Sequence, residues 1–164
     1  MDKHTFTSLV LEAEPALYHV ARSILKDEAS CEDAVQNSIL KAYEKRSTLK
    51  EEGYFKTWLT RIMINECYGI LRKRRPVVSY EEYFTDQETK EAVNGSGSPE
   101  EEYTELYLAL ERLELPLRIT LVLYYIEGYS VKEIRTLLKI PEGTVKSRLA
   151  TGRKRLKRIM EGEG

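Results

Sequence analysis

A chain of 164 residues, 41% hydrophobic and 32% charged, has the composition of a soluble folded protein with room for one domain or two small ones. No apolar run approaches the roughly 18 to 20 residues that span a bilayer, and the polar start MDKHTF lacks a signal-peptide core, so a cytoplasmic protein is expected. The formal net charge of −1 conceals a segregation of sign, because nine acidic residues stand against one lysine between positions 81 and 105.

Metal-binding and catalytic patterns are missing from the sequence. Cys31 and Cys67, with His4 and His19, are too few and too scattered for a zinc site or a disulfide framework. Both cysteines fall in helical patterns and are expected to be small, half-buried apolar residues. Nothing resembles a phosphate-binding glycine loop or a nucleophile elbow. The sequence therefore supports no enzyme class, and no metal or cofactor is expected.

The first 75 positions are predicted to be helical throughout, because glycine and proline are nearly absent and no alternating run indicates a strand. A first helix is expected around positions 6–10, Pro15 suits the opening turn of a second, and Ser30 suits the N-cap of a third. In the third helix Val35, Ile39 and Ala42 share one face, which is expected to be the core face.

The opposite face of this third helix is mostly polar and carries one apolar residue, Leu40. Its neighbours there are Asp33, Gln36, Asn37 and Glu44. A leucine in polar surroundings fits a docking surface for another protein, but single exposed leucines are also common on monomers. Both interpretations remain open from the residues alone.

Positions 44–53 are polar and end in glycine, so they are expected to form a loop. The next helix, from about 54 to 74, is apolar over most of its circumference and is expected at the centre of a bundle. One stripe stays polar, with Arg61, Asn65, Tyr68 and Arg72 at helical spacing, and the helix ends in the basic run RKRR. Cationic, amide and aromatic groups on one face suit nucleotides, and a solvated face explains the pattern equally well.

Positions 77–102 lose helical periodicity and contain NGSGSP, which is typical of a flexible linker. The acidic charge of this segment is expected to keep it extended and away from DNA. Helices then follow from about 103 to 113 and from Pro116 to about 126. The expected fold is all-α, with two small helical domains at 1–76 and 103–164 joined by a flexible acidic linker at 77–102.

Residues 130–156 are predicted to form two short helices joined by a tight turn. Ser130 and Glu133 have the spacing of a capping box, and Pro141 ends the first helix. The inward stripes are Val131, Ile134, Leu137 and Leu138, then Val145, Leu149, Gly152 and Leu156. The outward residues are Lys146, Ser147, Ala150, Thr151 and Lys154, flanked by Arg148, Arg153 and Arg155.

Positions 139–158 contain eight Lys or Arg against one acid. A narrow buried stripe with small polar residues between cations suits the DNA major groove, so a DNA-binding helix-turn-helix is predicted. The alternative is a pair of amphipathic surface helices whose charges are merely solvated. The tight turn and the charge density argue against this alternative.

Three segments together resemble the extracytoplasmic-function (ECF) sigma factors of bacterial RNA polymerase. EDAVQNSILKAYEK at 32–45 resembles the signature of sigma region two. FKTWLTRIMINECYGILRKRR at 55–75 resembles the family's promoter-melting helix, with Trp58 and Asn65 at two of its motif positions. Residues 115–156 are similar to sigma region four, most specifically at EGTVKSRL. Departures from the family pattern, such as Asn37 and Gly69, leave the promoter sequence undefined.

The resemblance implies a cytoplasmic, monomeric sigma factor of the stress-response type, without catalysis of its own. Its implied partners are the clamp helices of core RNA polymerase, duplex and non-template single-stranded promoter DNA, and an anti-sigma factor. The implied polymerase contacts are Asp33, Gln36, Asn37 and Leu40. The implied minus-ten contacts are Trp58, Arg61, Asn65, Tyr68, Arg72 and Arg74, with a flipped base held by the loop at 47–53. The implied minus-thirty-five contacts are Thr144, Lys146, Ser147, Arg148, Thr151, Arg153, Lys154 and Lys157.

A stand-alone helix-turn-helix regulator is the alternative hypothesis. Its N-terminal bundle would dimerise, and the dimer would bind two operator half-sites about 34 Å apart without polymerase. A helical adaptor that binds only proteins would leave the basic helix unexplained.

Overall fold

The structure is a computed structural model that describes residues 1–74 and 101–162. Every regular element within these ranges is helical. The linker predicted at 77–102 lies outside the described residues except for its last two positions, which belong to a helix.

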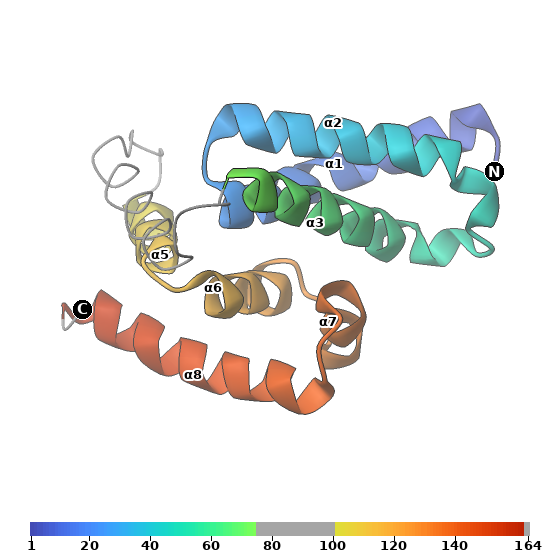
Figure 1. Cartoon of the computed structure of the whole chain (residues 1–164). Coiled ribbons are helices and arrows are strands. Elements are labelled where there is room, and N and C mark those ends of the chain that lie inside the picture. The colour runs from blue at the N-terminus through green and yellow to red at the C-terminus, as the bar shows by residue number, and fades with distance from the viewer. Residues whose placement is uncertain (75–100, 163–164) are drawn as a thin grey trace.

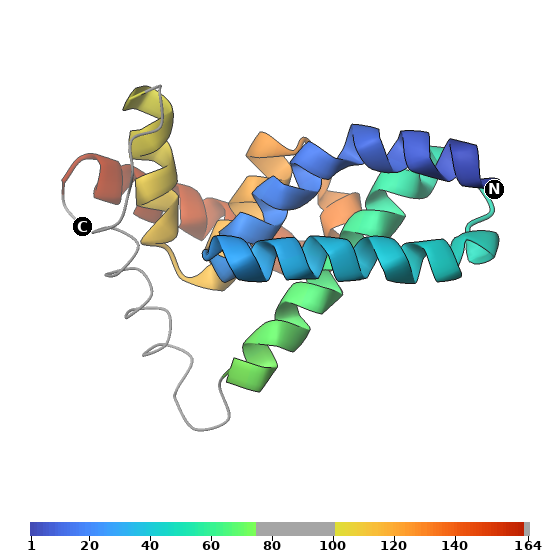
Figure 2. The same ribbon diagram turned by 90° about the horizontal axis from the view of Figure 1, so that it is seen from above.

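The first domain is a bundle of three helices, α1 (Lys3–Leu25), α2 (Glu28–Glu44) and α3 (Phe55–Arg74). The helices α1 and α2 run side by side and α3 crosses them at an angle (Figures 1 and 2). Between α2 and α3 the chain makes two 3-10 turns, η1 (Arg46–Thr48) and η2 (Glu52–Tyr54), where a loop is predicted.

Two predictions for this bundle are wrong in detail. The two helices predicted on either side of Pro15 are one helix, because the buried face continues past the proline through Ala13 and Leu17. The N-cap of α2 is Asp27 rather than Ser30, since the Asp27 carboxylate accepts a hydrogen bond from the Ser30 N–H at 2.9 Å. A carboxylate is the better cap because it also favours the positive end of the helix dipole.

The two cysteines are more deeply buried than predicted. Cys31 of α2 and Cys67 of α3 are fully enclosed in the bundle core, and neither forms a disulfide. The Cys67 thiol lies 3.4 Å from the sulfur of Met63, and burial raises the pKa of this thiol far above its usual range. A neutral, enclosed thiol packs as a small apolar side chain.

The second domain contains α5 (Glu101–Glu111), α6 (Leu115–Leu121), α7 (Val131–Leu138) and α8 (Glu142–Met160). A π-helical turn, η3 (Val122–Ile126), extends α6, and Pro116 lies in the first turn of α6 as predicted. The long helix α8 crosses α6 closely at Gly152, where an added Cβ would meet Leu121 at 3.1 Å. The two domains pack against each other, with α1 against α6 and α3 against α7 (Figure 1).

Candidate nucleic-acid and polymerase interfaces

The helix-turn-helix predicted at 130–156 is formed by α7 and α8. Its capping box is complete, because Ser130 accepts from the Glu133 N–H at 3.1 Å and Glu133 accepts from the Ser130 N–H at 2.8 Å. Lys139 ends α7 in the left-handed conformation, and Pro141 precedes the first turn of α8. The buried stripe of α8 is Val145, Leu149 and Gly152, with Leu156 half-buried.

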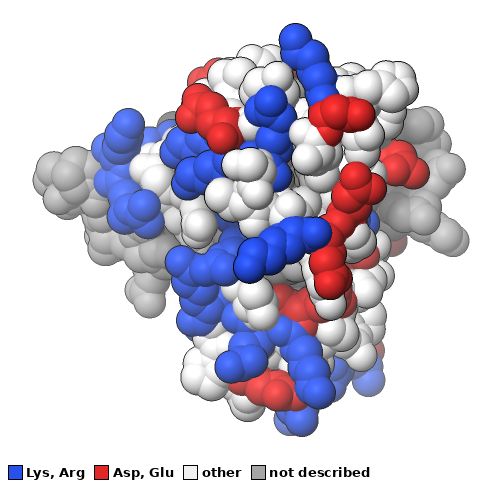
Figure 3. Space-filling view, turned by 90° about the vertical axis from the view of Figure 1, so that its right-hand side faces the viewer, with Lys and Arg blue, Asp and Glu red and all other residues white. Residues whose placement is uncertain are grey.

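The residues predicted to contact the minus-thirty-five element lie mostly on the exposed side of α8. Lys146, Ser147, Thr151, Arg153, Lys154 and Lys157 are exposed, whereas Thr144 and Arg148 are half-buried. Figure 3 shows the face that carries the α7 end of the molecule, where Lys and Arg side chains gather in a band across the middle and again below it. Arg153 donates a hydrogen bond to the Tyr125 hydroxyl at 3.1 Å, which turns this cation toward η3.

The residues predicted to contact the minus-ten element divide into three groups on α3. Asn65 and Arg72 are exposed. Trp58, Arg61 and Tyr68 are half-buried. Arg74 is held by α2, where its guanidinium lies 3.1 Å from the Asp27 carboxylate and donates to the Ser30 hydroxyl.

The Arg74 contact also affects the cap of α2. Burial alone would raise the pKa of Asp27, but the hydrogen bonds from Ser30 and the charge of Arg74 lower this pKa below its ordinary value. Arg74 therefore has a structural role in joining the end of α3 to the start of α2.

The face of α2 predicted to dock on polymerase points away from the core. Asp33, Gln36 and Asn37 are exposed on it, and Leu40 is 62% exposed. On the inner side Val35 and Ala42 are buried as predicted, while Ile39 is only half-buried. At the C-terminal end of α2 the Arg46 guanidinium lies 3.9 Å from the centre of the Tyr43 ring. This contact holds the start of the loop between α2 and α3.

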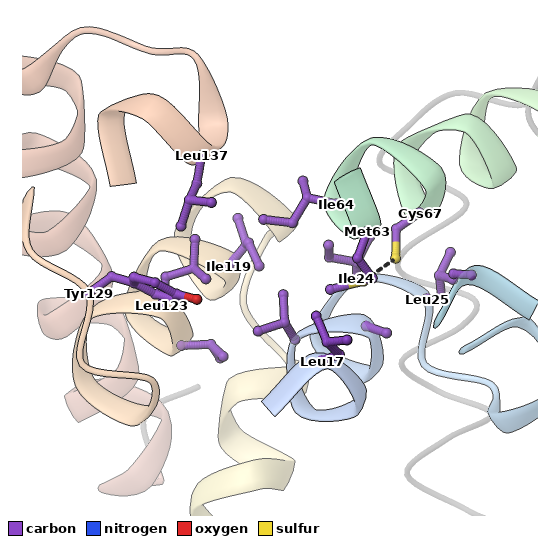
Figure 4. Close-up of a cluster of buried hydrophobic side chains, with 14 of the residues drawn as sticks. Leu17, Ile24, Leu25, Met63, Ile64, Cys67, Ile119, Leu123, Tyr129 and Leu137 are labelled. Carbon is purple, nitrogen blue, oxygen red and sulfur yellow. Dashed lines mark hydrogen bonds between the residues drawn. The ribbon is translucent and has the colours of Figure 1, made fainter. Parts of the chain in front are cut away.

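The apolar contact between the two domains centres on Ile64 of α3. In Figure 4, Ile64 points toward Ile119 and Leu137 of the second domain, whereas its neighbour Met63 points into the three-helix bundle. All four side chains are fully or almost fully buried. The helix α3 packs on both domains, and this explains why it is apolar over most of its circumference.

Polar groups also cross between the domains. Arg118 of α6 is 1% exposed and donates to the Ser23 carbonyl of α1 at 2.5 Å and to the Leu113 carbonyl at 2.6 Å. The Lys26 ammonium, at the end of α1, donates to the Glu111 carbonyl at 3.0 Å. The Thr60 and Tyr129 hydroxyls, both buried, are hydrogen bonded at 2.9 Å.

A buried carboxylate lies at the same junction. The Glu127 side chain is 6% exposed and its carboxylate is 3.6 Å from Nδ1 of His19. Burial raises the pKa of Glu127, and the nearby His19 and Lys56 only partly oppose this rise. The ionised form of Glu127 is therefore less stable here than in water.

This packing brings together residues predicted for two separate promoter elements. Tyr68 of α3 is half-buried beside the second domain, where burial raises the pKa of its phenol and the charges of Arg148 and Arg118 oppose the rise. Roles for Arg118, Tyr129 and Glu127 were not predicted from the sequence. The position of Arg118 within the apolar run LPLRITLVLYY was a usable signal for a buried polar contact. A lone cation in such a run is buried only when it is paired or hydrogen bonded.

Among residues 1–74 and 101–162 no group of three or more His, Cys, Asp or Glu side chains is arranged to hold a metal ion. In the same ranges, no helix combines the length and apolar character needed to span a bilayer.

A helical bundle followed by a helix-turn-helix domain, with a basic recognition helix, defines a DNA-binding transcription protein. Residues 9–77 match Sigma-70 region 2, and residues 103–156 match Sigma-70, region 4. The chain belongs to the ECF sigma factors of the sigma-70 family, as its resemblance in sequence predicted. It is an RNA polymerase sigma factor, and these matches favour that function over a stand-alone regulator. Sigma factors are transcription initiation factors and not enzymes in themselves.

Individual relatives agree with this assignment. The chain is 29% identical over 161 residues to the ECF RNA polymerase sigma factor SigM of Mycobacterium tuberculosis, covering 97% of this chain and 79% of SigM. It is 30% identical over 131 residues to the ECF RNA polymerase sigma-E factor of Salmonella typhimurium, covering 74% of this chain and 69% of that protein. The structure resembles the sigma factor RpoE from Bartonella quintana, solved in complex with the anti-sigma factor NepR. That comparison has a TM-score of 0.76 and 25% identity, and covers 96% of this chain and 97% of RpoE.

Proposed function

We propose that this sigma factor acts in the cytoplasm as a monomer and uses three separate surfaces. The outer face of α2 docks on the clamp helices of core RNA polymerase. The exposed side of α8 reads the minus-thirty-five duplex, and the polar stripe of α3 captures non-template bases of the minus-ten element as the strands separate. The observation that carries the proposal is the outer face of α2.

That face combines an exposed apolar side chain with polar groups on a rigid helix. Leu40 is surrounded by exposed Asp33, Gln36 and Asn37, while the opposite side of α2 is packed into the bundle. An apolar residue ringed by polar ones matches the usual anatomy of a protein interface, with a central anchor and a polar rim. Docking through α2 would leave α3 and α8 free for DNA.

The DNA-binding assignments rest on which side chains are accessible. Lys146 and Ser147 are exposed in the first turns of α8, from which a recognition helix reaches base edges. Lys154 and Lys157 are exposed further along, where contacts to phosphate are expected. On α3, Asn65 is exposed and its amide can pair with the edge of an unstacked base.

Use of the minus-ten surface requires the two domains to separate. Tyr68 is half-buried and its phenol is subject to the charge of Arg148, and Ile64 is covered by the second domain. We infer that the closed arrangement is a resting form of the protein and that an anti-sigma factor acts by retaining it. The RpoE structure, which was solved with the anti-sigma factor NepR, supports a partner of this kind.

In vitro transcription tests the overall proposal. The purified chain is added to sigma-free core polymerase with a library of promoters. We expect promoter-specific initiation that appears only when both proteins are present. A chain that shifts duplex DNA tightly without polymerase and never supports initiation would instead be a stand-alone regulator.

A matched pair of surface variants tests docking through α2. Leu40→Arg is compared with Leu11→Arg, because Leu11 of α1 is 65% exposed and lies outside the proposed docking face. Both variants should keep their melting temperature, since single surface substitutions usually change stability by under about 0.5 kcal/mol. Only Leu40→Arg should lose co-elution with core polymerase in gel filtration, because it places an unpaired charge in the interface. Wild-type affinity of Leu40→Arg for core polymerase would rule out this face as the docking surface.

A further inference from the structure

A polar groove of about 650 Å³ lies where α3 faces the turn of the helix-turn-helix. Arg61 of α3 lines one side, and Arg135 of α7 and Lys139 at its C-cap line the other. Among the described residues, Glu142 is the only acid in the lining. The groove thus carries net positive charge, in keeping with the band of Lys and Arg across the middle of Figure 3. Because its walls come from both domains, the groove exists only while the domains are closed.

The three cations in this groove are not paired with an acid among residues 1–74 and 101–162. Among the residues that the structure describes, none of Arg61, Arg135 and Lys139 forms a salt bridge. Closure of the domains brings Arg61 toward like charges from the other domain, which is unfavourable by itself. An anion between them would replace this repulsion with attraction on both sides.

The backbone at Lys139 gives a second reason to expect a ligand. Lys139 has φ 56° and ψ 47°, which is the left-handed conformation. Glycine is the usual residue at this position after a helix, because a Cβ destabilises the left-handed conformation. The lysine at this site therefore contributes charge to the groove at the expense of local backbone stability.

We propose that the groove binds a small oligophosphate and thereby holds the two domains together. Guanidinium groups bind phosphate oxygens in bidentate geometry, and the ammonium group of Lys139 adds a third cation. The described lining residues include no aromatic ring for base stacking, and the volume of the groove lies within the roughly 300–1,000 Å³ of small-molecule sites. Because Arg61 is also proposed to contact the minus-ten element, a bound oligophosphate would compete with the promoter. That competition rests on the proposed function, whereas binding to the free protein does not.

Calorimetric titration of the full chain with inorganic triphosphate at fixed ionic strength tests binding, and sulfate is the reference anion. Closure is followed by fluorescence energy transfer between dyes on cysteines introduced as Leu11→Cys and Arg112→Cys, which are exposed positions in the two domains. The native cysteines are buried and should stay unlabelled. We expect triphosphate, but not sulfate, to bind and to raise the transfer efficiency.

Three variants separate a groove that spans both domains from general charge attraction. Lys139→Gly should retain or raise the melting temperature, because it relieves the left-handed backbone, yet bind triphosphate about tenfold more weakly after losing one charge-assisted contact. Arg61→Gln should weaken binding by a similar factor although it changes the other domain. Lys132→Gln, an exposed cation of α7 outside the groove, should bind as the wild type does.

Several results would overturn this proposal. Equal binding of sulfate and triphosphate would reduce the effect to ionic strength. An Arg61→Gln variant with wild-type affinity would show that the site does not span the domains. Single-stranded DNA that binds through Arg61 and Lys139, when triphosphate does not, would make the groove a nucleic-acid contact. The titration and the energy-transfer measurement use the free protein without core polymerase or promoter, so failure of this inference and failure of the proposed function are distinguishable.

Discussion

The hydrogen bond between Thr60 and Tyr129 joins the two domains, and its removal is expected to open the closed form. Both residues are buried, and their hydroxyl oxygens are 2.9 Å apart. Tyr129→Phe leaves the Thr60 hydroxyl without its partner, and an unpaired buried hydroxyl costs about 1 to 3 kcal/mol. The lower end is expected, because a helical threonine can bond back to a carbonyl of its own helix. A change of this size reduces the ratio of closed to open forms by about 5-fold to 150-fold.

A double-mutant cycle isolates this interaction from the general effects of each substitution. Thr60→Val leaves the Tyr129 hydroxyl unpaired, and the double variant removes both polar groups together. The two single variants should therefore lower interdomain energy transfer, and the double variant should recover much of the loss, with a coupling energy of about 0.5 to 3 kcal/mol. The dye pair on Leu11→Cys and Arg112→Cys reports all four proteins. Strict additivity of the two single effects would refute the argument that these hydroxyls stabilise closure as a pair.

Three further predictions concern single residues. Asn65→Ala should still assemble with core polymerase but show weaker permanganate reactivity of unpaired thymines at the minus-ten element, with circular dichroism to exclude unfolding; wild-type reactivity would remove Asn65 from the site. Lys146→Ala should reduce the free energy of binding to the minus-thirty-five element by about 1 to 3 kcal/mol and alter sequence preference there. Lys154→Ala should weaken binding to all promoters alike. An equal loss on every promoter with Lys146→Ala would indicate a phosphate contact instead. Because burial raises the pKa of Glu127, closure should weaken as the pH rises through that pKa, and Glu127→Gln should raise energy transfer at neutral pH and reduce this pH dependence. A variant with an unchanged pH profile would show that Glu127 does not govern closure.

The local features of this fold were predictable because they depend on neighbours in sequence. The capping box at Ser130 and Glu133 and the buried stripe of α8 follow from residue spacing, and both are confirmed. The wrong predictions concern places where two local structures fit the sequence and tertiary packing selects one of them. A Pro15 that suits a helix start lies inside α1, because the apolar face on both sides of it is buried in one bundle.

The closed arrangement of the domains was not predictable from the same patterns. A helix that is apolar over most of its circumference is predicted to be central, but periodicity alone does not say that Ile64 packs on a second domain while Met63 packs in the bundle. The partners of Arg118 are backbone carbonyls, which carry no sequence signal. The candidate contacts for DNA and polymerase came from family motifs, and they stay predictions until variants are measured.

The composition of the interdomain contact suits surfaces that separate in use. Arg118 and Lys26 donate to backbone carbonyls across the junction, and all of these groups can bond to water once the domains part. An interface of aliphatic side chains alone would lose the full hydrophobic contribution on opening, with no such compensation. Contacts between domains of one chain are generally more polar than permanent interfaces, and relative motion is their usual behaviour. The raised pKa of the buried Glu127 acts in the same direction, because its ionised form weakens closure. The closed form is therefore held weakly enough for promoter DNA, which is proposed to contact α3 residues such as the half-buried Tyr68, to shift the equilibrium toward opening.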